Sequence, residues 1–102
     1  MELRPGTRLR SVTSESEVVV VRAPTEDVAI GCGGSPMVPA GAEVAPTSTP
    51  QPGLDEPTLL GKRYADDDAG LELLCTKAGV GTLTCAGRIM LLKDAKPLPS
   101  SD

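Results

Sequence analysis

The hexapeptide Glu17-Val18-Val19-Val20-Val21-Arg22 is the strongest secondary-structure signal in this 102-residue chain. β-Branched residues favour strands over helices, and this run is bounded by a charge at each end. On its amino-terminal side, Arg8-Leu9-Arg10 alternates charged and apolar residues, and on its carboxyl-terminal side Val28-Ala29-Ile30 is a short apolar run. We therefore expect residues 1–37 to form a β lobe in which these three segments make an antiparallel meander.

The second half of the chain shows further strand signals. Apolar or alternating runs occur at residues 58–64, 71–76, 82–85 and 89–92, and turn-forming residues separate them. No segment of the chain combines apolar residues at helical spacing with helix caps. The sequence predicts an all-β protein in which residues 58–102 form a second β-meander with a polar tail, and in which the two lobes share one core.

Residues 38–57 differ in composition from both lobes. They are rich in Ala, Gly, Ser and Thr and include five prolines, namely Pro39, Pro46, Pro50, Pro52 and Pro57. Proline excludes a helix interior or a paired central strand and favours extended conformations. We expect a linker or strap, and because a lobe of under about 40 residues rarely folds alone, the first lobe needs support from the second lobe or from another copy of the chain.

Composition excludes several classes of protein. The net charge of −4 and a single aromatic residue, Tyr64, argue against a nucleic-acid partner, which calls for a basic face or stacking rings. No apolar run is long enough to cross a bilayer, and residues 1–5 lack the apolar core of a secretion signal. We expect a cytoplasmic protein that does not bind membranes.

The chain has no histidine and three cysteines, Cys32, Cys75 and Cys85. The lack of imidazole excludes Ser-His-Asp and Cys-His catalysis and removes the commonest metal ligand. An odd number of cysteines in a reducing compartment favours free thiols. No catalytic constellation is visible, so the chain is more readily understood as a non-enzyme.

One arrangement of residues resembles a known metal-binding pattern. Ser11-Val12-Thr13-Ser14 precedes the valine strand, and Gly31-Cys32-Gly33-Gly34-Ser35-Pro36-Met37 follows it. The layout resembles the desulforedoxin-like domain found at the amino terminus of desulfoferrodoxins, whose pattern is Cys-x-x-Cys, a valine-rich strand and Cys-Cys-Gly-x-Pro-Met. The resemblance covers about residues 6–37 and implies a small rubredoxin-like or desulforedoxin-like β knuckle.

The same comparison implies that the metal site is degenerate. Three of the four thiolate positions fall on Ser11, Ser14 and Gly31, and Cys32 alone remains. Two residues separate Gly33 from Pro36 where the pattern allows one, so Cys32 matches either of the paired cysteines. Serine hydroxyls are poor metal ligands at neutral pH, and we expect no metal and no other cofactor at this site.

Two alternatives remain for the cysteines. A nest of backbone N–H groups beside Arg8 or Arg10 would lower the pKa of Cys32 and make it a reactive thiol. Cys32 with Cys75 and Cys85, an aspartate, or a second copy of the chain would instead hold zinc or iron in a small metal or redox protein. The plainer interpretation is that Cys75 and Cys85 are buried packing residues.

Lys62-Arg63-Tyr64 is a small basic segment that contains the chain's one ring. Arginine and tyrosine are frequent at binding hot spots, so these residues are candidates for a protein contact, although a solvent-facing strand edge is the commoner role. The sequence as a whole favours a non-enzymatic accessory or interaction protein that binds a protein partner or itself. The rival is the metal or redox protein, and an enzyme with Cys32 as nucleophile lacks a base.

Overall fold

The computed structural model describes residues 3–41 and 49–93. Within these ranges every regular element is a β-strand and every strand pair is antiparallel, so the all-β prediction is confirmed. The strands of the described residues are β1 (Arg8–Arg10), β2 (Glu17–Arg22), β3 (Ile30–Cys32), β4 (Ser35–Pro36), β5 (Val38–Pro39), β6 (Pro57–Thr58), β7 (Arg63–Asp66), β8 (Leu71–Lys77), β9 (Gly79–Val80), β10 (Leu83–Cys85), β11 (Arg88–Ile89) and β12 (Leu91–Lys93).

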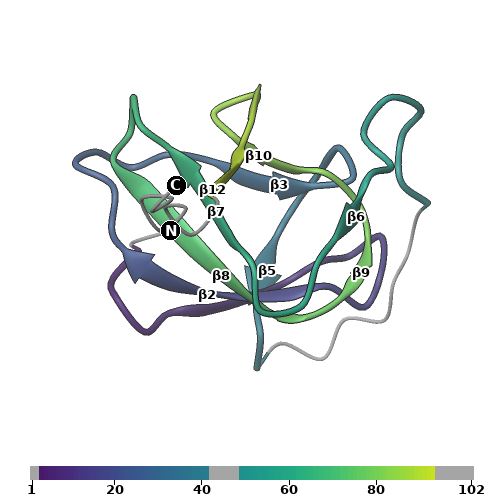
Figure 1. Cartoon of the computed structure of the whole chain (residues 1–102), viewed down its shortest axis with the longest axis horizontal. Helices are drawn as coiled ribbons and strands as arrows, with labels where there is room; N and C mark the ends of the chain where they lie inside the picture. Colours follow the sequence, from purple (N-terminus) through teal and green to yellow (C-terminus); the bar gives the residue numbers. More distant parts are fainter. Residues whose placement is uncertain (1–2, 42–48, 94–102) are drawn as a thin grey trace, which may run out of the picture.

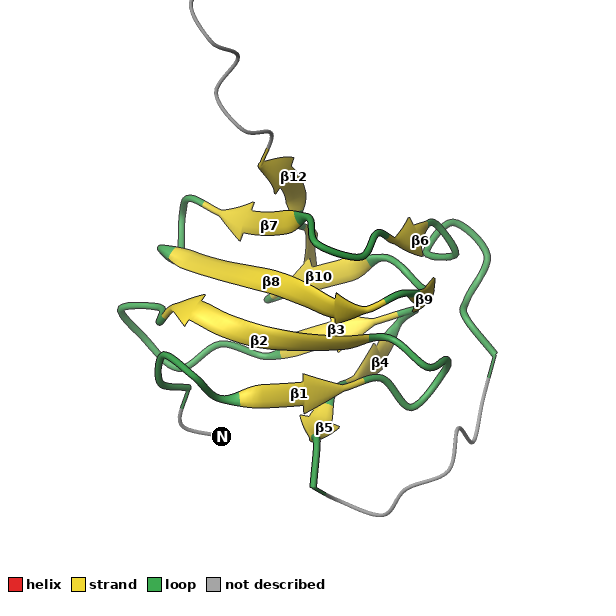
Figure 2. Ribbon diagram, turned by 60° about the horizontal axis from the view of Figure 1, so that its bottom comes forward, coloured by secondary structure: helices red, strands yellow, loops and turns green. Residues whose placement is uncertain are grey.

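The described strands form two packed layers. The larger sheet has the order β12-β7-β8-β2-β1-β5, and the smaller sheet has the order β11-β10-β3-β4. Figure 1 shows β3 and β10 of the smaller sheet above β2 of the larger sheet. A short pair, β6 with β9, lies beside them. Seen from the larger sheet, β8 and β2 lie in front of β10 and β3, so the core is the space between these layers (Figure 2).

The valine run forms β2, at the centre of the larger sheet between β1 and β8. Val18 and Val20 are buried toward the smaller sheet, and Val19, which points the opposite way, is half-buried. Alternation of this kind is what a strand with one core-facing side requires. The sequence predicted this strand, with the bounds observed.

The pairing of the later strands differs from the predicted meanders. β3 does not lie beside β2 but crosses to the smaller sheet, where Ile30 to Cys32 pair with Cys85 to Leu83 of β10. β7 and β8 form the predicted hairpin, although the strand predicted over residues 58–64 is divided into β6 and β7. β8 pairs next with β2, and β10 pairs with β3 and β11. Each sheet therefore joins a block of strands from the first half of the sequence to a block from the second half, because each half alone has too little apolar surface to bury itself.

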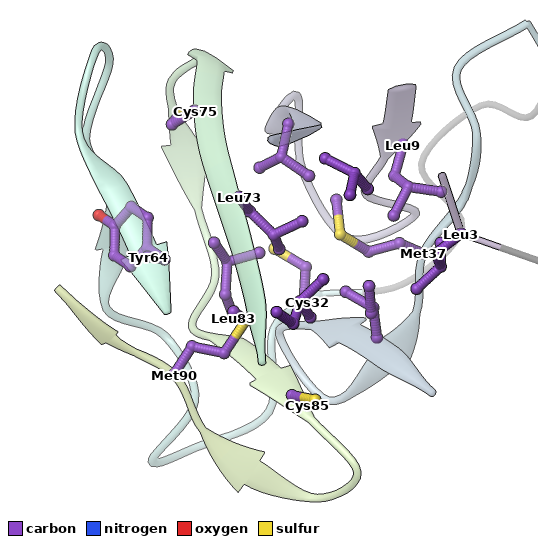
Figure 3. Close-up of a cluster of buried hydrophobic side chains, with 14 of the residues drawn as sticks. Leu3, Leu9, Cys32, Met37, Tyr64, Leu73, Cys75, Leu83, Cys85 and Met90 are labelled. Atoms are coloured by element: carbon purple, nitrogen blue, oxygen red, sulfur yellow. The ribbon is translucent and has the colours of Figure 1, made fainter. Parts of the chain in front are cut away.

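The predicted shared core is confirmed and is mostly aliphatic. Its buried residues come from both halves of the chain, and Figure 3 shows Leu73, Leu83 and Cys32 near the middle of the cluster. Tyr64 is buried at its side, where the phenol oxygen accepts a hydrogen bond from the Leu59 N–H at 2.9 Å. A buried tyrosine needs such a partner.

The described part of the proline-rich segment is hydrogen-bonded to the body of the protein. β5 pairs with β1 at the edge of the larger sheet, a position that tolerates Pro39. Farther on, the Gln51 N–H donates to the Gly33 carbonyl and the Thr82 N–H donates to the Leu54 carbonyl, both at 2.9 Å. Residues 42–48, which include Pro46, lie outside the described residues.

A buried carboxylate ties the two sheets together at the turn predicted around residues 66–70. Asp66 accepts hydrogen bonds from the Asp68 N–H at 3.0 Å and from the Arg88 Nη2 at 3.0 Å. Burial acts to raise the pKa of Asp66, but hydrogen bonds from the Cys85 thiol, the Ala69 N–H and Arg88 outweigh it and leave the pKa below its ordinary value. The charged form of Asp66 is thus the one that the fold stabilises.

We expect Asp66→Asn to lower the free energy of unfolding by about 1.5–3 kcal/mol at neutral pH, the usual contribution of hydrogen bonds to a charged group. Because the folded-state pKa is depressed, this contribution is complete above about pH 4 and is lost as the pH falls through the lowered pKa. Urea unfolding of both proteins between neutral and acidic pH measures it. Asp67→Asn is the control, since Asp67 is an exposed neighbour, and an equal loss in the two variants would contradict this account.

Candidate functional site

A group of buried hydroxyl and thiol side chains lies where the β1–β2 loop meets the ends of β3 and β8. We call it the hydroxyl–thiol cluster. Its members are small polar residues that are buried or half-buried in an otherwise aliphatic interior: Ser11, Thr13, Ser14, Ser16, Cys32, Thr58 and Cys75.

The β1–β2 loop points its hydroxyls inward by bonding to itself. The Ser11 N–H donates to the Ser16 carbonyl at 2.8 Å, the Thr13 N–H donates to the Ser11 Oγ at 3.0 Å, and the Ser14 Oγ donates to the Ser16 Oγ at 3.2 Å. Short hydroxyl side chains form such local turns readily. The loop is also fastened to β3, because the Thr13 Oγ1 donates to the Cys32 carbonyl at 3.2 Å.

Cys32 lies at the centre of the cluster and is completely buried. Burial raises the pKa of its thiol, the polar surroundings supplied by the nearby hydroxyls of Ser11, Ser16 and Ser14 lower it, and the neighbouring Cys75 thiol raises it again. The net result is a raised pKa, because three neutral hydroxyls do not replace the lost hydration of a thiolate. The geometry does not supply the activation by Arg8 or Arg10 that a reactive thiol would need.

The far side of the cluster is formed by β6 and β9. The hydroxyls of Ser16 and Thr58 are hydrogen-bonded to each other, and the Thr58 Oγ1 donates to the Gly79 carbonyl at 3.0 Å. Gly81 packs so closely that a Cβ built on it would lie 2.7 Å from the Cys32 Sγ. A glycine is needed where a backbone approaches a side chain this closely.

The structure brings together some of the positions singled out from the sequence. Ser11 and Ser14 lie near Cys32 and lower the pKa of its thiol, whereas Gly31 is directed elsewhere, since a Cβ there would meet the Thr84 Oγ1 at 2.7 Å. Sequence reasoning missed Ser16, which also lies near Cys32 and lowers that pKa. The available signal was the spacing of Ser14 and Ser16, which places two hydroxyls of one tight loop near each other.

The donor groups do not fit a thiolate-bound metal. One thiol and three hydroxyls meet at Cys32, and hydroxyls are weak ligands for zinc or iron. Cys85 lies apart, next to Asp66. Across residues 3–41 and 49–93, no three cysteine, aspartate or glutamate side chains are grouped as metal ligands.

The three thiols are expected to be unreactive in the folded protein. Burial raises the pKa of each one, and for Cys85 burial together with Asp66 raises the pKa to about 11. A raised folded-state pKa stabilises the fold below the ordinary thiol pKa of 9.0, and that stabilisation is lost as the pH rises from 9.0 toward about 11.

Labelling with a thiol reagent at pH 7–8 should therefore proceed at the rate of global unfolding, for all three cysteines alike. Thermal melts should also show a lower melting temperature as the pH rises above about 9. A cysteine that reacts at once with the folded chain, at the rate of an unfolded control peptide, would contradict the assignment of these thiols as buried and protonated.

The Lys62-Arg63-Tyr64 segment does not form one patch. Tyr64 points into the core, Arg63 points outward and lies 3.6 Å from Glu72 in an ion pair, and Lys62 is in the turn before β7. The alternation of side chains along a strand separates Arg63 from its two neighbours. Arg63 is therefore the member that the structure leaves on an open sheet surface.

A second candidate site is an apolar edge that the sequence did not single out. The chain crosses from β11 in the smaller sheet to β12 in the larger sheet, and Met90 between them is buried. Its neighbours Ile89 and Leu91 are 56% and 69% exposed, and Leu92 is 40% exposed. We call Ile89, Leu91 and Leu92 the apolar edge.

A hollow of about 240 Å³ adjoins the apolar edge. Ile89 and Leu91 form its apolar wall, the Asp66–Asp68 turn and Arg88 form its polar wall, and Ala65 completes its lining. Large apolar side chains exposed beside a hollow are more typical of a contact surface than of a solvent-facing loop.

Comparison of the chain with protein families, with characterised proteins and with solved structures finds no match. In the described ranges, no helix of the length and apolarity needed to span a bilayer is present. The site geometry is therefore the basis of the functional proposal.

Proposed function

We propose that this chain is a non-enzymatic accessory protein that works in the cytoplasm and holds a protein partner, or a second copy of itself, at the apolar edge. The observation that carries the proposal is the exposure of Ile89 on β11 and of Leu91 and Leu92 on β12, since these two strands are edge strands of the smaller and the larger sheet. Exposed leucine and isoleucine on an edge strand favour association unless a charge or a proline blocks it.

The backbone of the edge supports the same function. β12 pairs with β7 on one side, and no described strand pairs with its other side. An edge strand offers its free N–H and C=O groups to an incoming strand, and apolar side chains beside it supply the binding energy. The neighbouring hollow is able to accept one apolar side chain of that partner.

The hydroxyl–thiol cluster supports a structural role for the rest of the molecule. The proximity of Ser11 and Ser14 to Cys32 is in keeping with our proposal of a desulforedoxin-like scaffold that has lost most of its metal ligands. Hydrogen bonds among hydroxyls then hold together the loop that a metal holds in the related pattern. The alternative, a metal or redox protein, stays a prediction, and it is tested by measuring the metal content of the purified protein.

Affinity capture of the full chain from its own host, at native abundance and after cross-linking, tests the proposed function. Leu91→Asp places a charge on the apolar edge and should reduce recovery of the partner or of the self-associated form about tenfold, as loss of a hot-spot side chain does. Leu60→Asp is the matched control, because Leu60 is 65% exposed in the turn between β6 and β7.

Two outcomes would count against the proposal. Equal recovery with Leu91→Asp and Leu60→Asp would show that the apolar edge is not the contact. The absence of both a partner and a self-associated form with the natural chain would remove the function itself.

A further inference from the structure

The outer face of the larger sheet has a charge opposite to that of the whole chain. We define the outer face as the side chains of this sheet that point away from the smaller sheet, the side seen in Figure 2. It includes six of the ten lysine and arginine residues of the chain but two of its fourteen acids: Arg8, Arg10, Arg22, Arg63, Lys77 and Lys93, with Glu17 and Glu72. The face is positive on a protein whose net charge is −4.

The strand register places the basic groups around an apolar centre. One row of directly opposed residues crosses the sheet from β12 to β1 in the order Lys93, Arg63, Leu74, Val19 and Arg8. Residues that oppose each other in antiparallel strands share a face. Basic residues at both ends of the row therefore flank the half-buried pair Val19 and Leu74 in its middle.

The acids on this face neutralise part of it and leave the rest available. Glu72 forms ion pairs with Lys93 at 2.7 Å and with Arg63 at 3.6 Å. Arg8 and Arg22 are exposed, and neither makes an ion pair with a carboxylate of the described residues. Exposed guanidinium groups bind carboxylates in a bidentate, directional manner.

We propose that the outer face binds an acidic segment of a partner protein, extended in form, in which glutamate or aspartate alternates with apolar residues. The acids would pair with Arg8 and Arg22, and the apolar residues would cover Val19 and Leu74. Leu91 of the apolar edge points to the same face, opposite Ala65, so the two surfaces are continuous. This inference rests on the proposed function and names its partner chemistry.

A protein segment fits this face better than a nucleic acid does. Single-strand binders stack bases on aromatic rings, and the chain's one ring, Tyr64, is buried on the opposite side of β7. The apolar centre also has no counterpart in a phosphate backbone, whereas alternating acidic and apolar residues match both parts of the row. Charge complementarity of this kind sets partner choice and association rate.

A labelled ten-residue peptide of alternating glutamate and valine tests the inference by fluorescence anisotropy with the full chain. Arg8→Glu and Arg22→Glu should each weaken binding about fivefold, the effect of reversing one exposed charge contact. Lys62→Glu changes the net charge equally and should change affinity less than about twofold, because Lys62 is in phase with the inward-facing Tyr64 and off the outer face. Binding should also weaken when the ionic strength rises from about 0.05 M to 0.5 M.

Several results would overturn the inference. They are no measurable binding of the peptide, equal losses of affinity with Arg8→Glu and Lys62→Glu, or tighter binding of a DNA duplex or of phosphatidylserine vesicles than of the peptide.

The proposed function and this inference can fail independently of each other. A host partner that is lost with Leu91→Asp but kept with Arg8→Glu supports the proposed function and overturns the inference. Peptide binding through Arg8 and Arg22, with no partner or self-association in the host, supports the inference and overturns the proposed function.

Discussion

The variant Ser11→Cys/Ser14→Cys/Ser16→Cys is expected to bind one zinc ion tightly at the hydroxyl–thiol cluster. In the natural chain these three hydroxyls lie near the Cys32 thiol and lower its pKa, so three thiols in their place would lie close to it. Four thiolates at one point are a tetrahedral zinc site. The substitutions at Ser11 and Ser14 fill two ligand positions of the desulforedoxin-like pattern, and the one at Ser16 stands in for the third, Gly31. The variant would thus convert a hydrogen-bonded cluster into a metal centre.

The expected gain in stability is large. A ligand present at a thousand times its dissociation constant adds about 4 kcal/mol to the free energy of unfolding. For a domain of this size that corresponds to a rise in melting temperature of roughly 15–30 °C. Calorimetry with and without zinc measures the gain, and visible absorption of the cobalt-loaded variant reports thiolate ligation.

A second triple variant controls for added thiols in general. Ser11→Cys/Ser14→Cys/Thr25→Cys has the same number of cysteines, but Thr25 is in the exposed turn after β2 and far from the cluster in the fold. It should show a much smaller response to zinc. An equal response in both variants, or none in either, would mean that Ser11, Ser14 and Ser16 do not converge on Cys32 as described.

Replacing Gly81 by alanine is expected to destabilise the fold more than alanine at any open glycine turn. Gly81 has a φ of +153°, and an added Cβ would lie 2.7 Å from the Cys32 Sγ and 3.2 Å from the Gly33 nitrogen. Both neighbours belong to the end of β3, which is fixed by pairing with β10. The surroundings have little freedom to move away.

Gly53→Ala is the matched control for this substitution. Gly53 also has a positive φ, +85°, but an added Cβ would meet no atom within 4 Å. The difference in unfolding free energy between the two variants is the cost of the clash. We expect it to be about 1–3 kcal/mol, the range for overpacked cores. Denaturant unfolding of the two variants measures it.

A double variant identifies the sulfur as the cause. Cys32→Ala/Gly81→Ala removes the sulfur atom that the new methyl group would meet. The double variant should therefore lose less unfolding free energy than the two single variants lose together. Equal stability of Gly81→Ala and Gly53→Ala would show that the backbone at Gly81, directly after β9, does not pack against Cys32.

The local elements were predictable from the sequence, but their pairing was not. The alternation at Val18 to Val20 and the hairpin turn at Asp66 are local signals, and each predicts its element without reference to the rest of the chain. The partner of β3 is decided by which apolar face lies opposite Ile30 and Cys32 after folding. That choice depends on residues more than fifty positions away, which local patterns do not encode.

The candidate sites follow the same division. Ser11, Ser14 and Cys32 were identified because they occur at a recognisable spacing, whereas Thr58 reaches the cluster through the β6–β9 pair and has no sequence signal of its own. The apolar edge was missed for a related reason. The run at residues 89–92 reads as a strand with a buried side, but the crossing between sheets buries Met90 and exposes its two neighbours.

Native mass spectrometry of the protein taken from its own host tests the central claim most directly, because one spectrum reports both bound metal and bound protein. The account predicts a metal-free chain of 10.5 kDa in a complex with a partner protein or with a second copy. A chain that carries stoichiometric zinc or iron and no associated protein would contradict it.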